Sequence, residues 1–133
     1  MFSKKKDEKN AVKPRIFTQL EQLCADDKET YEALAPVMFL DPRKVETTVK
    51  QAAENAKRFE KEKDFVSARM WYEVAGGLSL YEGNAKKVVE YYGSAERVTG
   101  GTYLILKSPD KAVAKAQEYY SKYLTDAAGA TKA

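Results

Sequence analysis

The fold of this chain is decided between residues 45 and 92, where the sequence reads VETTVKQAAENAKRFEKEKDFVSARMWYEVAGGLSLYEGNAKKVVEYY. The middle of this stretch carries two apolar stripes at helical spacing. One stripe holds Phe65, Ala68, Tyr72 and Ala75, and the other holds Trp71, Val74, Leu78 and Tyr81. A helix on a protein surface needs only one apolar stripe. We therefore predict a helix from Asp64 to about Tyr81 that is covered by neighbouring helices on more than one side.

The preceding helix has a narrow seam of mostly small residues, which suits the close approach of two helices. The seam consists of Val45, Val49, Ala52, Ala56 and Phe59. Asp41-Pro42 places a capping acid before a proline, so this helix is expected to run from about Pro42 to Lys61. Only residues 62–64 separate it from the next helix, and a connection this short predicts an antiparallel hairpin.

The rest of the chain also favours helices. Helical spacing predicts further helices over 14–24, 31–38 (shortened by Pro36), 85–98 and from 109 onward. Residues 103–106 are predicted to be an extended or one-turn segment, because the chain has no second strand-like run to pair with them. We therefore predict an all-α domain over residues 14–125, built of antiparallel helical hairpins stacked as a small repeat-like bundle of five or six helices. Residues 1–13 are predicted to be a disordered basic tail and residues 126–133 a frayed one.

Composition argues against several classes of function. The chain has 133 residues, 32% of them charged, with one cysteine and no histidine. Without histidine it lacks the commonest general base and metal ligand, so we predict no metal, no cofactor and no enzymatic activity. Paired carboxylates such as Glu60 and Glu62 are expected on a solvated helix face. The absence of a long apolar run predicts no membrane span, and the single Cys24 fits a reducing, cytoplasmic setting.

One spacing pattern resembles a known family. The series Ala56-x2-Phe59-x5-Phe65-x2-Ala68-x3-Tyr72-x2-Ala75 is similar to the alternation of small and large residues in one tetratricopeptide repeat. It is also similar to the three-helix microtubule-interacting-and-trafficking domain. The match covers about one repeat and departs from it at Ala52, where a large aromatic is expected. The resemblance implies a ligand groove faced by Lys50, Ala53, Lys57 and Glu60.

These features predict a noncatalytic interaction module, a scaffold or adaptor that binds a partner peptide or helix. Lys50, Lys57 and Lys61 lie away from the seam of their helix and would suit an acidic ligand, or would form a merely solvated face. Tyrosines are favoured at interfaces because they bury area and keep a polar tip. Tyr91, Tyr103 and Tyr119 are therefore candidates for a surface docking patch or oligomer contact, with the rim of the core as the alternative.

Two other functions remain open at this stage. The net charge of +3 is concentrated near the N-terminus, where a nucleic acid could bind a basic tail through its phosphates. The residues that would bind the nucleic acid are Lys4, Lys5, Lys6, Lys9, Lys13 and Arg15. The third possibility is a structural subunit of a filament or coat, whose tails would order on assembly.

Overall fold

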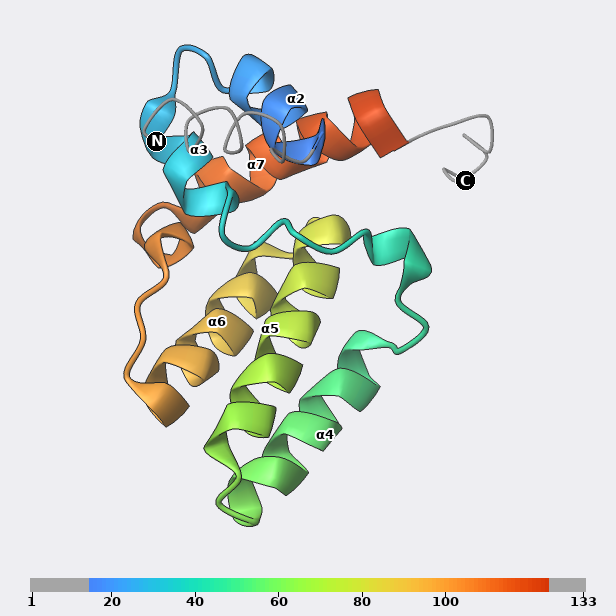
Figure 1. The fold of residues 1–133 in the computed structure, drawn as a ribbon, viewed down its shortest axis with the longest axis vertical. Coiled ribbons are helices and arrows are strands. Elements are labelled where there is room, and N and C mark those ends of the chain that lie inside the picture. The colour runs from blue at the N-terminus through green and yellow to red at the C-terminus, as the bar shows by residue number, and fades with distance from the viewer. Residues whose placement is uncertain (1–14, 125–133) are drawn as a thin grey trace, which may run out of the picture.

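The computed structural model describes residues 15–124, and their fold is all-α, as predicted. This part of the chain forms six α-helices and no strand (Figure 1). The helices are α2 (Arg15–Leu23), α3 (Lys28–Leu34), α4 (Val49–Lys61), α5 (Phe65–Tyr81), α6 (Ala85–Thr99) and α7 (Pro109–Tyr119). Two 3-10 helices, η1 (Pro42–Lys44) and η2 (Leu104–Lys107), and one π-helical turn, η3 (Tyr120–Leu124), complete the described elements. The predicted tails, residues 1–13 and 126–133, lie outside the described residues.

The two turns that join α4, α5 and α6 are built alike. Each turn contains a residue with a left-handed backbone, Lys63 (φ 62°) or Gly83 (φ 76°). The next residue, Asp64 or Asn84, caps the following helix by accepting a hydrogen bond from a backbone N–H three residues on. Such short turns reverse the chain, so the predicted antiparallel hairpin is confirmed and a second one follows it.

The predicted long helix from Pro42 to Lys61 is wrong in its first part. The Asp41 carboxylate does accept from the Arg43 N–H at 3.0 Å, but only η1 follows. The backbone then becomes extended at Val45, and α4 begins after Thr48, whose hydroxyl accepts from the Gln51 N–H at 3.1 Å. A threonine hydroxyl competes for backbone hydrogen bonds in this way, which favours a cap over a helix interior.

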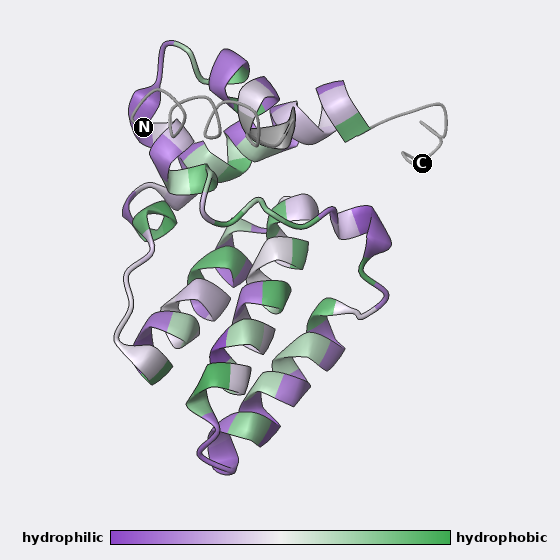
Figure 2. Ribbon diagram, in the orientation of Figure 1, coloured by the Kyte–Doolittle hydropathy of each residue, from purple (hydrophilic) through white to green (hydrophobic). Residues whose placement is uncertain are grey.

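Helix α5 lies between α4 and α6, and the three helices stand side by side (Figure 1). Trp71 and Val74 are partly buried and pack against the core, which confirms that α5 is covered on more than one side. Coloured by hydropathy, α4–α6 show green and purple segments mixed along each helix, so hydrophobic and hydrophilic residues alternate along them (Figure 2). Helices α2, α3 and α7 pack across one end of this layer.

Small residues allow the close approach of α5 and α6. A side-chain carbon at Gly76 would lie 2.6 Å from the ring of Tyr92, which is itself fully buried. Close packing of α5 against Tyr92 on α6 therefore accounts for the glycine at position 76. The same carbon at Gly77 would lie 3.8 Å from the Tyr92 hydroxyl, an ordinary contact, so Gly77 is not required by packing.

Helix α7 joins α3 to the layer formed by α4, α5 and α6, which we call the three-helix layer. Gln117 Nε2 donates to the carbonyl oxygens of Leu80 and Tyr81, at 2.8 and 3.0 Å, where α5 ends. The last carbonyls of a helix have no partner within the helix, so Gln117 supplies one from another element. Lys111 on α7 also pairs with Asp27, the cap of α3, at 3.3 Å.

Candidate functional site

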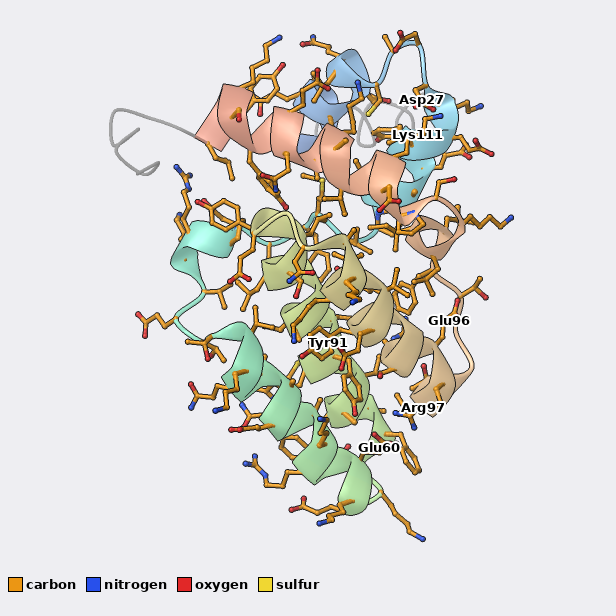
Figure 3. All side chains as sticks on the ribbon, turned by 180° about the vertical axis from the view of Figure 1, so that it is seen from behind. Asp27, Glu60, Tyr91, Glu96, Arg97 and Lys111 are labelled. Atoms are coloured by element: carbon orange, nitrogen blue, oxygen red, sulfur yellow. The ribbon has the colours of Figure 1, made fainter. Side chains whose placement is uncertain are left out.

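Glu60, near the end of α4, joins three helices. Its Oε1 accepts from the hydroxyl of Tyr72 on α5 at 2.8 Å and from Nη2 of Arg97 on α6 at 3.3 Å, and its Oε2 accepts from Arg97 Nη1. Figure 3 shows the Glu60 and Arg97 side chains near one another. The hydrogen bond from Arg97 is the main reason that the pKa of Glu60 lies below its ordinary value. Of the two carboxylates expected on a solvated face, Glu62 is exposed, whereas Glu60 is partly buried and paired with Arg97.

Lys50 and Lys57 share a stripe of α4 with Ala53 and Glu60, because these positions recur at steps of three and four. At one end of this stripe, Glu60 reaches α6 through Arg97. Ala53 is buried and both lysines are exposed. The two ammonium groups therefore lie at the edge of the packed interior. Lys61, the last residue of α4, is exposed as well, but no contact given by the structure places it beside α6.

Lys87 on α6 adds a third cation that the sequence analysis missed. It lies one turn before Tyr91, and its Nζ is 5.8 Å from the centroid of the Tyr91 ring. A cation over an aromatic face is attracted to the ring, and the spacing of four residues was the available signal. We call the surface formed by Lys50, Lys57, Lys87, Tyr91 and the Glu60–Arg97 pair the α4–α6 face. Tyr91, Glu60 and Arg97 are labelled together in Figure 3.

The expectation that Tyr91, Tyr103 and Tyr119 stand at the surface is wrong. They are 5%, 8% and 2% exposed, respectively, and all three belong to the core. Helix α6 buries Tyr91 as well as Tyr92, and Tyr119 at the end of α7 is buried together with Tyr120, the first residue of η3. Each of these helices is covered by more than one neighbour, so adjacent side chains both point inward. In the sequence, two apolar stripes indicated more than one covered side for α5 alone.

The hydroxyls of two of these tyrosines hold distant segments together. Tyr103, before η2, accepts from Arg69 Nε at 2.9 Å and donates to the Glu73 carboxylate, so it ties the segment after α6 to α5. Burial, followed by the bond to Glu73, raises the pKa of Tyr103 to about 12. Tyr119 donates to Gln19 Oε1 on α2 at 3.0 Å. Both hydroxyls therefore serve packing within the chain.

The basic residues of the nucleic-acid alternative fall largely outside the described part of the chain. Lys4, Lys5, Lys6, Lys9 and Lys13 lie in the undescribed residues, and Arg15 is the first residue of α2. Within residues 15–124, no group of three or more Cys, Asp or Glu side chains is arranged to hold a metal ion. No helix in that range is long and apolar enough to cross a membrane.

Comparisons with known proteins leave this face without a relative to guide its interpretation. No family model matches the chain, and neither the curated proteins nor the solved structures give a match.

Proposed function

We propose that the chain is a noncatalytic scaffold or adaptor whose α4–α6 face binds an acidic segment of a protein partner. The single observation that carries this proposal is a set of three exposed cations without an anionic partner. Among the described residues, no ion pair involves Lys50, Lys57 or Lys87. A carboxylate supplied by a ligand would provide the missing charge.

Rigidity supports the same function. Glu60 fixes α4 to α5 and α6, so the lysines project from helices whose relative positions are held by hydrogen bonds. Because Arg97 is already paired with Glu60, a ligand carboxylate would meet the lysines first. The resemblance of residues 56–75 to a tetratricopeptide repeat agrees with a peptide ligand, and the buried Cys24 thiol agrees with a reducing, cytoplasmic setting.

The test measures binding of a synthetic peptide rich in Asp and Glu, with a free C-terminal carboxylate, to the full chain. We expect saturable binding that weakens as salt is added, because exposed charges are screened. Lys50→Glu with Lys57→Glu should abolish it. The matched control, Lys28→Glu with Lys107→Glu, makes the same charge change at exposed positions on α3 and η2 and should retain binding.

Two outcomes would contradict the proposal. Equal loss of binding in both double variants would show that only net charge matters. Unchanged binding in the Lys50→Glu, Lys57→Glu variant would remove the α4–α6 face as the site. A partner captured from the source cell should depend on the same two lysines and not on the control pair.

A further inference from the structure

A second surface, separate from the α4–α6 face, is a hollow of about 310 Å³ lined largely by rings. Four of its lining side chains are aromatic: Phe39, Tyr119, Tyr120 and Tyr123. We call it the aromatic hollow. A smaller hollow that extends to Val74 on α5 shares Phe39 and Tyr120 with it, so apolar surface continues from one hollow into the other.

The aromatic hollow has a buried inner part and an exposed rim. Tyr119 and Tyr120 are almost fully buried, and their rings stand at 83° to one another with centroids 6.0 Å apart. Phe39 and Leu40, which also line the hollow, are 56% and 46% exposed. Large apolar side chains exposed together are typical of a surface that binds another molecule. The rim is therefore part of the candidate site.

The lining of the aromatic hollow offers no unpaired charge. Among its described residues only Asp41 is charged, and the Asp41 carboxylate accepts from Arg43 Nε and Nη2 at 3.0 and 2.9 Å. The carbonyl of Leu124 accepts from Arg43 Nη1 at 2.9 Å, and Gln19 Oε1 accepts from the Tyr119 hydroxyl at 3.0 Å. A charged group that entered the hollow would lose its hydration without gaining an unpaired partner, which costs free energy. The lining therefore favours an uncharged occupant.

The volume of the aromatic hollow indicates the size of that occupant. An apolar cavity of about 150 Å³ holds one benzene molecule. The hollow is about twice as large and accommodates a two-ring group, which among amino-acid side chains is that of tryptophan. Tryptophan is enriched among the side chains that fill pockets at the centres of protein interfaces. A free two-ring molecule would leave the exposed parts of Phe39 and Leu40 in water, whereas a peptide that carries the tryptophan can cover them.

One cation stands at the rim. Lys122 Nζ is 5.5 Å from the centroid of the Tyr123 ring, which lines the aromatic hollow. Lys122 is exposed, and no ion pair within residues 15–124 involves it. An acidic residue beside the tryptophan would supply the missing charge.

We propose that the aromatic hollow binds a tryptophan side chain of a protein partner, next to an acidic residue of the same partner that pairs with Lys122. The exposed rings and Leu40 at the rim are then covered by the partner's backbone. An adaptor with this hollow and the α4–α6 face can hold two partners at once. The two proposals concern different residues, so each can fail without the other.

The test measures binding of a fluorescein-labelled peptide to the full chain by fluorescence anisotropy. The peptide carries one tryptophan between two aspartates, glycine or serine elsewhere, and an amidated C-terminus. We expect saturable binding that weakens more than about tenfold when alanine replaces the tryptophan, as for the anchor of an interface. Phe39→Ala should weaken binding about fivefold or more. The matched control, Phe65→Ala, removes a ring that is 42% exposed at the start of α5 and should leave binding unchanged.

Lys122→Ala should weaken binding by only about twofold, because exposed ion pairs contribute little. Circular dichroism verifies that each variant is folded. The proposal would be overturned by peptides with tryptophan and alanine that bind equally, or by equal affinities of the Phe39→Ala and Phe65→Ala variants. Loss of binding in the Lys50→Glu, Lys57→Glu variant would assign the peptide to the α4–α6 face instead. Indole that binds as tightly as the peptide would reject a protein partner in favour of a small molecule.

Discussion

The three-helix layer, α4 to α6, and the chain-end layer, formed by α2, α3 and α7, are held together in different ways. In the three-helix layer each helix packs on the next one in sequence, across a turn of three residues that includes the next helix's cap. In the chain-end layer the contacts join distant residues. Tyr119 bonds to Gln19, 100 positions away, and Lys111 pairs with Asp27.

The difference shows two ways of fixing a layer. Interactions between residues close in sequence fix the three-helix layer, whereas contacts between distant residues close the chain-end layer. Caps, short turns and small residues at regular spacing act over a few residues, so they determine the three-helix layer from within. The helix that closes the chain-end layer has weaker local signals: the Ser108 side chain makes no capping bond to α7, and the helix ends in the π turn η3. Its position depends on what α2, α3 and α5 present to it. The following predictions test how far the two layers depend on one another.

The largest effect is expected from Leu34→Ala in the chain-end layer. Leu34 is fully buried, and removing such a side chain costs about 2–5 kcal/mol of unfolding free energy. Urea unfolding should be followed both by circular dichroism and by the fluorescence of Trp71, the only tryptophan, on α5. We expect both signals to shift together, because α7 joins the layers. If Trp71 unfolds at the wild-type midpoint, the layers are independent. Val89→Ala, at a position 42% exposed, is the control.

Within the three-helix layer, Gly76→Ala and Gly77→Ala should have opposite effects. The added carbon at position 76 meets the buried Tyr92 ring at 2.6 Å, so we expect a loss of about 1–3 kcal/mol. At position 77 the space is open and alanine favours the helix, so we expect a gain of about 0.5–1 kcal/mol. Urea unfolding of the two variants measures both changes in the free energy of unfolding. A loss at both positions would show that α5 and α6 are packed more tightly at Gly77 than the structure indicates.

Gln117→Ala should weaken the junction between the layers. The substitution removes two hydrogen bonds to the carbonyl end of α5, which are worth about 1–2 kcal/mol together. Amide hydrogen exchange near Leu80 and Tyr81 should accelerate more than the global loss of stability explains. Gln22→Ala, at an exposed position on α2, is the matched control. An identical response in the two variants would mean that Gln117 does not secure α5.

The smallest effect is expected from exchanging the residues with a left-handed backbone in the two similar turns. Lys63 adopts the left-handed backbone that Gly83 adopts in the next turn, and that conformation suits glycine. Lys63→Gly should therefore stabilise the chain by about 0.5 kcal/mol, after the greater freedom of glycine in the unfolded state is subtracted. The reverse exchange, Gly83→Lys, should destabilise it, because Gln117 also lies 3.3 Å from a side-chain carbon at position 83. Thermal or urea unfolding shows whether each substitution stabilises or destabilises the chain.

The candidate site could be predicted from the sequence only in part. Lys50 and Lys57 share a helix face with Glu60, and regular spacing was sufficient to find them. The sequence could not show that Glu60 reaches Tyr72 and Arg97, because those contacts depend on how three helices are placed. The same limit explains Tyr91 and Tyr119. Their exposure depended on whether α6 and α7 have one covered side or two.

By itself, the sequence determined the helical class, the α4–α5 hairpin and the central position of α5, because spacing, caps and turn length act within a few residues. Tertiary structure alone decided which tyrosines are buried and how α7 closes the chain. These features depend on contacts between segments tens of residues apart. A local pattern shows that a side chain needs a partner, but only the packed fold shows which partner it meets.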